Sequence, residues 1–242
     1  MNELLRYGIN AAKMAGDFIS STRPTTIEIK SHCNDFVTDV DKMSQELIRD
    51  FLKETKINLL GEESFEEYTP SEDFLWVVDP IDGTANYVKG NPLVGVNIAL
   101  VKADKVLLGV TYLPYLDQMY HAVLDGGSFL NEVRYQRDDN PYGVIIADPT
   151  EEVCQKDVDR KMGSFRRLGA SSVEMAWCSR GIYSAVMYKK NKIWDIAPGI
   201  LLISESGGVV KRRADSIATG MFEDGRIIAG SRERVGELQN YT

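Results

Sequence analysis

Two aspartates lie three residues apart at the end of an apolar run, in the segment Asp79-Pro80-Ile81-Asp82-Gly83-Thr84. Residues 74–78 before them are apolar, which predicts a buried strand. Carboxylate oxygens are the ligands that hard divalent cations prefer. Gly83 and Thr84 predict a turn into a helix, whose first backbone N–H groups suit a phosphate oxygen. The segment therefore combines metal ligands with an anion site, which indicates metal-assisted phosphate chemistry.

The segment also has an ordinary structural interpretation, because Asp-Gly is common in turns and Asp79 could cap such a turn. Two further acidic elements favour the chemical interpretation: Gly61-Glu62-Glu63 after a short apolar run, and Trp194-Asp195 before an apolar, helix-like segment. Adjacent residues on a strand point to opposite faces, so both glutamates can be ligands only if the backbone turns there. A solvated acidic loop that continues through Glu66 and Glu67 is the alternative.

These elements together resemble the inositol monophosphatase family, the lithium-sensitive, magnesium-dependent sugar phosphatases. The family pattern is Asp-Pro-Ile/Leu-Asp-Gly-Thr, then any residue, then Asn or Glu and an aromatic, and residues 79–87 match it at every position. A second pattern, Trp-Asp followed by small residues, matches residues 194–199. The resemblance covers nearly the whole chain and implies an α+β, layered αβαβα sandwich with the active site between two subdomains.

The resemblance also implies ligands for two or three Mg²⁺ ions. Asp79 would bridge two of them, and the other ligands would be Glu62, the carbonyl of Ile81, Asp82 and Asp195. Two metals about 3.5–4 Å apart could clamp both the attacking and the leaving oxygens. For Asp195, a simpler interpretation is a favourable charge at the start of a helix.

Other residues would act on the water and the substrate by the same resemblance. Thr84, Glu63 and Asp41 would position the nucleophilic water, with Asp41 accepting a hydrogen bond from the Thr84 hydroxyl. The substrate would contact Gly83 and Thr84, and also a loop that contains Ala170 and Ser171. These residues have structural alternatives: Asp41 as a first-turn acid of a helix, Thr84 as a helix N-cap, and the Gly-Ala-Ser-Ser run as a helix start.

Position 188 departs from the family pattern. Inositol-specific members carry a glutamate seven residues before the Trp-Asp aspartate, whereas this chain has Tyr188 there. A tyrosine at a substrate-binding position can hydrogen-bond or stack but supplies no carboxylate, so inositol 1-phosphate is in doubt as the preferred substrate. Nearby lysines, Lys189, Lys190 and Lys192, could attract a second phosphate, although a solvated basic turn is the more ordinary explanation.

Composition sets limits on the remaining function classes. The chain has 242 residues, a formal net charge of −8 and three cysteines, none of them in a Cys-x-x-Cys pair. The acidic balance shows no basic footprint for nucleic acid. The charged N-terminus and the lack of a long apolar run predict neither a signal peptide nor a membrane span, so we expect a cytoplasmic protein with free thiols.

Periodicity predicts the elements that must position these residues. Helices are expected at residues 2–20, 39–55, 150–161, 171–178 and 195–206, the last closed by Gly207-Gly208. Strands are expected at residues 25–30, 57–60, 74–78, 92–101, 106–112, 118–123, 144–147, 166–168, 184–188, 209–210 and 226–229, and residues 126–133 continue the sheet. The polar stretch 135–141 is the best candidate for a boundary between subdomains at 1–134 and 142–242 of one compact catalytic unit.

The sequence therefore predicts a Mg²⁺-dependent phosphomonoesterase that acts on a small phosphorylated polyol, sugar or nucleotide. The alternatives are a bisphosphate phosphatase, acting on fructose 1,6-bisphosphate or a 3′(2′),5′-bisphosphate nucleotide, and a histidinol-phosphatase. A non-catalytic metal- or phosphate-binding regulator is a remote alternative, since every catalytic acidic position is filled. The resemblance implies a homodimer, and the composition predicts no nucleic-acid or membrane partner.

Overall fold

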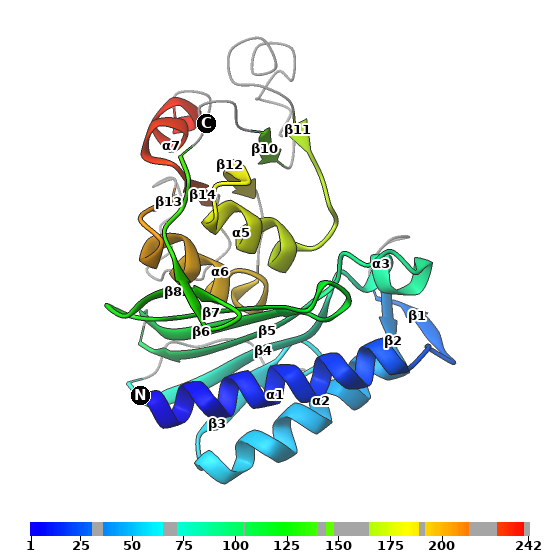
Figure 1. The fold of residues 1–242 in the computed structure, drawn as a ribbon. Helices are drawn as coiled ribbons and strands as arrows, with labels where there is room; N and C mark the ends of the chain where they lie inside the picture. Colours follow the sequence, from blue (N-terminus) through cyan, green and yellow to red (C-terminus); the bar gives the residue numbers. More distant parts are fainter. Residues whose placement is uncertain are drawn as a thin grey trace.

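The computed structural model describes residues 1–30, 36–64, 72–103, 105–139, 144–147, 165–188, 192–212 and 227–239. These residues form alternating layers of helices and sheets (Figure 1). None of the helices in these ranges is long and apolar enough to span a bilayer.

The larger sheet has seven strands and follows the chain order from β3 to β9. Only β3 and β4 pair in parallel; the other neighbours are antiparallel. Its strands are β3 Asn58–Gly61, β4 Phe74–Asp82, β5 Gly95–Lys102, β6 Lys105–Leu113, β7 Gln118–Val123, β8 Gly127–Leu130 and β9 Val133–Tyr135. Short 3₁₀ turns at Lys53–Thr55 and Pro114–Leu116 precede β3 and β7.

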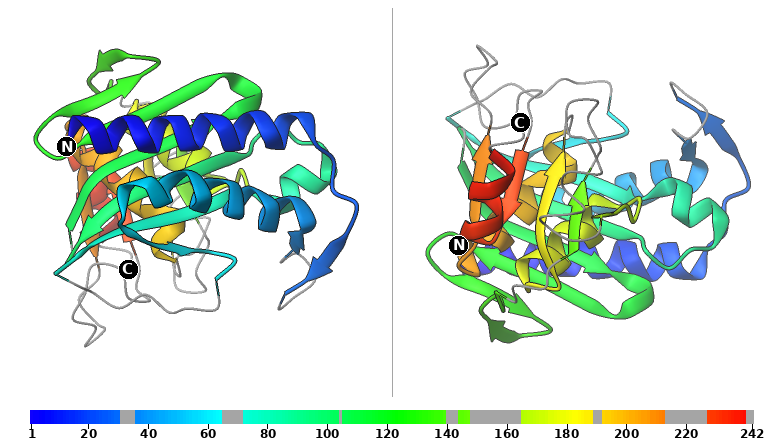
Figure 2. Two further views of the ribbon diagram at one scale, coloured as in Figure 1. Left: turned by 90° about the horizontal axis from the view of Figure 1, so that it is seen from below. Right: turned by 90° about the horizontal axis from the view of Figure 1, so that it is seen from above.

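Two helices, α1 (Asn2–Ser21) and α2 (Asp39–Leu52), lie side by side across one face of this sheet (Figure 2). Both have apolar residues at helical spacing, so each buries one stripe against the sheet. Ala12 of α1, Ile48 of α2 and Trp76 of β4 are all fully buried in this layer. This packing anchors the first turn of α2, which carries Asp41.

The opposite face of the sheet is covered by α5 (Ser171–Ser179) and α6 (Ile193–Glu205). Gly207 follows α6 with φ of +100°, the left-handed conformation expected where glycine ends a helix. A five-stranded sheet lies beyond these helices, in the order β11-β10-β12-β14-β13. Its strands are β10 Val144–Ala147, β11 Phe165–Arg166, β12 Tyr183–Tyr188, β13 Val209–Arg212 and β14 Ile227–Gly230.

The last layer is α7 (Arg232–Gln239), which packs Val235 and Leu238 against the outer face of the second sheet. The order helices, sheet, helices, sheet, helix confirms the predicted layered αβαβα sandwich. The boundary between residues 134 and 142 as a division into subdomains stays a prediction, although β9 belongs to the first sheet and β10 to the second.

Small elements at one end of the large sheet complete the site. The two-stranded ribbon of β1 (Ile27–Ile29) and β2 (Phe36–Thr38) leads into α2. A short helix, α3 (Thr84–Lys89), follows β4 directly. Sequence reasoning did not predict β2 or α7, and it predicted β5 to begin three residues early. The helix expected at residues 150–161 lies outside the described residues.

Candidate active site

Three aspartates converge where β4 ends and α6 begins. One carboxylate oxygen from each of Asp79, Asp82 and Asp195 lies within 4.8 Å of the other two. Side chains alternate along a strand, so Asp79 points to the same face as Val77, the face that α6 covers. The first turn of α6 carries Asp195. The pairing of β4 with β5 shifts between Asp79 and Asp82, which brings the second aspartate into the same cluster.

The electrostatics of this cluster favour a cation. Asp79 is 1% exposed, and burial raises its pKa, with further contributions from the nearby acidic groups. Burial and the neighbouring Asp82 likewise raise the pKa of Asp195. Burial raises the pKa of Asp82 to about 6, although hydrogen bonds from Ser172 oppose that rise. Because the donor set is carboxylate oxygen and a cation would offset the mutual repulsion, these residues fit a hard divalent metal.

The backbone turns after Gly61, so the opposite-face argument does not apply to the two glutamates. A Cβ at Gly61 would lie 2.0 Å from Gln45 Oε1, so glycine lets the Gln45 side chain approach this turn closely. Gln45 Oε1 also accepts a hydrogen bond from the Glu63 backbone N–H at 2.9 Å. Glu62 N donates to Val78 O at 3.0 Å, which holds the turn beside β4. The predicted acidic continuation at Glu66 and Glu67 lies outside the described residues.

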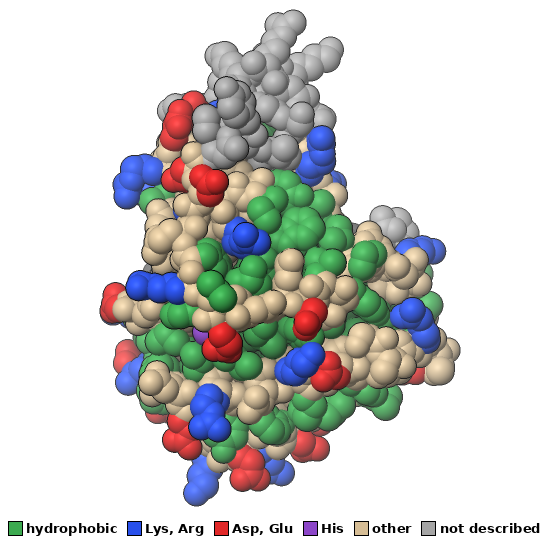
Figure 3. Space-filling model, viewed as in Figure 1, with side chains coloured by type: hydrophobic (Ala, Val, Ile, Leu, Met, Phe, Trp, Pro, Cys, Tyr) green, Lys and Arg blue, Asp and Glu red, His purple; other side chains and the backbone are tan. Residues whose placement is uncertain are grey.

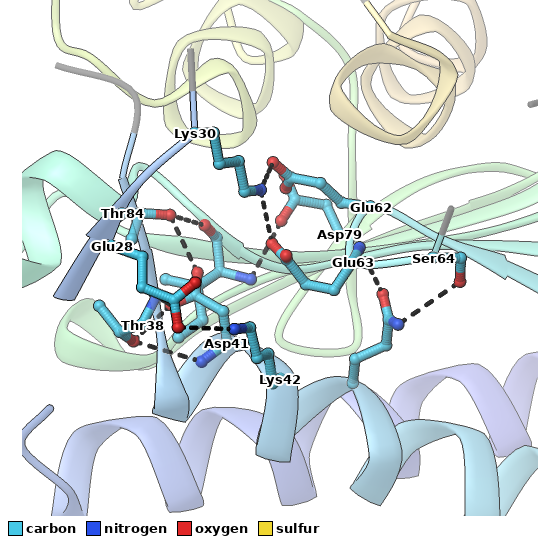
Figure 4. Close-up of polar contacts among 12 residues, drawn as sticks. Glu28, Lys30, Thr38, Asp41, Lys42, Glu62, Glu63, Ser64, Asp79 and Thr84 are labelled. Carbon is cyan, nitrogen blue, oxygen red and sulfur yellow. Dashed lines mark hydrogen bonds and ion pairs between the residues drawn. The ribbon is translucent and has the colours of Figure 1, made fainter. Parts of the chain in front are cut away.

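Lys30 binds both glutamates (Figure 4). Its Nζ lies 2.9 Å from Glu62 Oε1 and 2.7 Å from Glu63 Oε1, and its side chain is 26% exposed. Burial lowers the pKa of Lys30, but the two carboxylates outweigh burial and raise it. Burial raises the pKa of Glu63 despite this ion pair. Lys30 therefore belongs to the acidic site and is not a lysine on a free strand surface.

Asp41 makes both of the contacts that the sequence suggested, one at the start of α2 and one to Thr84. Its Oδ2 accepts from the Thr38 backbone N–H at 2.9 Å and from the Thr38 hydroxyl, which completes a capping box at the start of α2. Its Oδ1 lies 3.0 Å from Thr84 Oγ1. The Thr84 hydroxyl is also 3.1 Å from Ile81 O, the carbonyl predicted to bind metal. Burial raises the pKa of Asp41.

The Leu168–Ala170 loop packs against the turn at Gly83. Gly83 has φ of +88°, and a Cβ there would lie 2.9 Å from Ala170 Cβ. Asn86 Nδ2 of α3 donates to Leu168 O at 2.8 Å. Ala170 is only 2% exposed, so its side chain packs between the loop and the turn at Gly83.

The first residues of α5 contact the aspartates. The Ser171 hydroxyl donates to Asp195 O at 3.0 Å, and the Ser172 backbone N–H donates to Asp82 Oδ2. Ser172 was missed, although a carboxylate at a helix N-terminus is a favourable arrangement. Asn97 of β5 was missed too: its Nδ2 donates to Asp195 O at 3.2 Å. A polar residue within the apolar run 92–101 was the available signal.

Tyr188, at the end of β12, contacts another side chain that sequence reasoning missed. Its hydroxyl donates to Glu174 Oε2 at 2.7 Å. Burial raises the pKa of Glu174 to about 7 and that of Tyr188 well above its usual value. Lys189 and Lys190 lie outside the described residues. Lys192 is exposed, and its backbone N–H donates to Asp195 Oδ2 at 3.0 Å.

The sequence model of the inositol monophosphatase family matches residues 1–241. The chain belongs to this family. A fructose-1,6-bisphosphatase/inositol-1-monophosphatase of Aquifex aeolicus is 35% identical over 212 residues, covering 82% of this chain and 78% of the relative. The Nus factor SuhB of Pasteurella multocida is 28% identical, covering 87% of this chain and 85% of the relative.

Solved structures agree with this membership. The extragenic suppressor protein suhB of Bartonella henselae matches with a TM-score of 0.88 and 25% identity, covering 99% of this chain and 98% of that one. The layered αβαβα architecture is therefore that of the inositol monophosphatase family, and the acidic cluster lies on the motifs that the family resemblance had marked.

Proposed function

We propose that the protein is a Mg²⁺-dependent phosphomonoesterase acting on a small phosphorylated polyol, sugar or nucleotide. The convergence of Asp79, Asp82 and Asp195 is the observation that carries this proposal. Family membership and relatives named as phosphatases support it. Two or three Mg²⁺ ions held by these aspartates, Glu62 and the Ile81 carbonyl would supply charge neutralisation and a lowered pKa for bound water.

The chain's own groups orient the attacking water. Because the Thr84 hydroxyl donates its hydrogen to Asp41 or to Ile81 O, its oxygen lone pairs stay available to accept a hydrogen bond from water. Asp41, as a buried carboxylate, makes that oxygen a better acceptor. Glu63, on the turn after β3, supplies a second acceptor beside the acidic cluster. Thr84 and Glu63 together would fix the direction of in-line attack on phosphorus.

The phosphate would lie where β4 passes into α3. The backbone N–H groups of Gly83 and Thr84 begin this helix, and the left-handed conformation of Gly83 lets the chain turn tightly there. Asp82 directly precedes this turn, and its carboxylate lies close to that of Asp195. A phosphate bound at the turn would thus be near both the metal ligands and Thr84, as hydrolysis requires.

A bisphosphate is the second candidate substrate. Position 188 carries no carboxylate to read polyol hydroxyls, and the exposed Lys192 lies between β12 and Asp195, at the start of α6. The 35% identical Aquifex aeolicus relative is named for both activities. On the face seen in Figure 3, Lys and Arg are interspersed with Asp and Glu, without a large patch of one sign.

A non-catalytic regulator is a further alternative, because several relatives are named Nus factors. The filled acidic positions favour catalysis. The test is phosphate release from inositol 1-phosphate, fructose 1,6-bisphosphate, 3′-phosphoadenosine 5′-phosphate and histidinol phosphate, each with Mg²⁺ and with EDTA. We expect Mg²⁺-dependent release from at least one; release from none would contradict the proposal. A homodimer and a cytoplasmic location stay predictions.

A further inference from the structure

Glu174 is a buried carboxylate that the proposed mechanism does not use. It is 5% exposed and lies in α5, close enough to Asp82 for the two charges to repel. Burying a carboxylate near others of the same sign is costly unless its oxygens make strong hydrogen bonds. A leucine of similar size would fill the space without that cost, so the hydrogen bonds of Glu174 are the feature to explain.

Both oxygens of Glu174 accept hydrogen bonds from groups outside α5. Oε1 accepts the Leu168 backbone N–H at 2.8 Å, and Oε2 accepts the Tyr188 hydroxyl at 2.7 Å. The carbonyl of Leu168 is held from the other side by Asn86 Nδ2 at 2.8 Å. Side chains from α5 and α3 therefore bind both polar backbone groups of one loop residue.

This loop leads directly into the residues that touch the metal-binding aspartates. After Leu168 come Gly169 and Ala170, and then Ser171 and Ser172 at the start of α5. The Ser171 hydroxyl binds Asp195 O and the Ser172 N–H binds Asp82 Oδ2. Movement of the loop would displace both contacts, so the position of the loop sets the orientation of the Asp82 carboxylate and the position of the Asp195 backbone at the start of α6.

We propose that Glu174 is a positioning residue: supported by Tyr188, it holds the Leu168–Ala170 loop so that the start of α5 fixes Asp82 and Asp195 in a metal-binding geometry. The proposal rests on the proposed function for its catalytic consequence, but its direct consequence is the affinity for Mg²⁺. The carboxylate acts through the loop and through α5, and it contacts no ligand itself.

Two substitutions separate position from charge. Glu174→Gln and Glu174→Leu both remove the negative charge, but only glutamine keeps an oxygen that can accept the Leu168 N–H. We expect Glu174→Leu to raise the Kd for Mg²⁺, measured by calorimetry on the chelator-stripped protein, by about tenfold. Glu174→Gln should stay within about threefold of wild type. Tyr188→Phe should weaken Mg²⁺ binding less than Glu174→Leu, and combining it with Glu174→Leu should add little.

Glu205→Leu is the matched control. Glu205 holds another turn in the same way, accepting the backbone N–H groups of Asp125 and Gly127 at 2.9 and 2.8 Å, but it lies at the far end of α6 from Asp195. It should lower thermal stability and leave the Kd for Mg²⁺ unchanged. Equal losses of Mg²⁺ affinity in Glu174→Gln and Glu174→Leu, or no loss of affinity in either variant, would overturn the positioning role.

The calorimetric result is independent of turnover. A wild-type protein that binds Mg²⁺ but releases no phosphate from the substrate panel would contradict the proposed function and leave the positioning test intact. If the wild type is active, the kcat of Glu174→Leu at high Mg²⁺ should lie closer to the wild-type value than its kcat/KM does at low Mg²⁺. An activity loss that is independent of Mg²⁺ concentration would overturn the proposal.

Discussion

Thr84 Oγ1 lies 3.0 Å from Asp41 Oδ1, although 43 residues separate the two in the chain. The contact joins the first residue of α3 to the first turn of α2, and it exists because α2 packs against β4, the strand that ends at Asp82. The Thr38 capping box fixes the Asp41 carboxylate. The hydroxyl of Thr84 is thereby held between the Asp41 carboxylate and the Ile81 carbonyl, beside the acidic cluster.

Thr84→Val tests this relationship, because valine keeps the shape and removes the hydroxyl. We expect kcat to fall by roughly 100-fold, since one lost transition-state contact costs about 3 kcal/mol. Thr84→Ser keeps the hydroxyl and should retain most of the activity. The measurement is kcat at saturating Mg²⁺ and substrate. A Thr84→Val enzyme within a few-fold of wild type would remove this residue from the mechanism.

The ion pairs of Lys30 lead us to expect that its contribution to thermal stability depends on bound Mg²⁺. Its ammonium group neutralises Glu62 and Glu63 in the metal-free protein. Lys30→Met should therefore lower the thermal midpoint in EDTA, while saturating Mg²⁺ should restore most of the loss by supplying charge to the same carboxylates. Lys42→Met is the matched control, because Lys42 forms an equally short ion pair with Glu28 between exposed side chains. It should change the midpoint little in either condition. An equal loss for Lys30→Met with and without Mg²⁺ would contradict this role.

Asp82 predicts a pH dependence in the metal-free protein. Burial raises its folded-state pKa from 3.8 to about 6, so between about pH 4 and 6 the folded state holds more protons than the unfolded state. Stability contributed by this group is therefore complete below about pH 4 and is lost as pH rises through about 6. In EDTA, Asp82→Asn should be more stable than wild type at pH 7, by roughly 2 kcal/mol, with little difference at about pH 3.5. The measurement is the difference in denaturation free energy at the two pH values; an advantage that grows on acidification would have the wrong sign.

Lys192 predicts how salt affects substrate choice. If this exposed lysine attracts a second phosphate, Lys192→Met should lower kcat/KM for fructose 1,6-bisphosphate several-fold and leave that for inositol 1-phosphate nearly unchanged. Added salt should reduce the wild-type preference, because screening acts on exposed charges. Lys105→Met removes one exposed charge at the end of β6 remote from Asp195 and serves as the control. Identical effects of Lys192→Met on both substrates would exclude a second-phosphate contact at this lysine.

The role of position 188 is better tested by a conservative substitution than by the glutamate that inositol-specific members carry. Tyr188→Glu would place a second carboxylate against buried Glu174 and disturb the loop as well as specificity. Tyr188→Phe keeps the ring and removes only the hydroxyl, so it is the informative variant at this position.

The residues of the acidic cluster were predictable because they lie on short local motifs. The Asp79-to-Thr84 motif ends a strand whose alternation assigns the face of each side chain, and Asp195 lies in the first turn of a strongly apolar helix. The alternation of strands and helices indicated an α/β layer. The meeting of Asp195 with Asp79 and Asp82 and the order of the five layers were implied by the family resemblance, because they depend on which distant segments meet.

The features that the sequence left open or missed depend on tertiary contacts. The turn at Glu62 and Glu63 is set by Gln45 of α2, which packs onto Gly61 at the end of β3. Lys30 reaches the glutamates only because β1 pairs with β2, a three-residue strand too short to show a periodicity. Glu174 meets Tyr188 because α5 packs against β12, and its position within a helix gave no hint of a polar partner.

We propose above all that activity requires a divalent cation bound by the three aspartates. The most direct test adds Mg²⁺ to the chelator-stripped protein and measures the return of activity, in parallel for wild type and Asp195→Asn. The wild type should release no phosphate in EDTA and regain full turnover as Mg²⁺ is added. Asp195→Asn, which keeps the shape and loses one charge, should stay at least about 100-fold less active at the same limiting Mg²⁺. Full turnover by the wild type after exhaustive chelation, or equal activity of Asp195→Asn, would contradict the account.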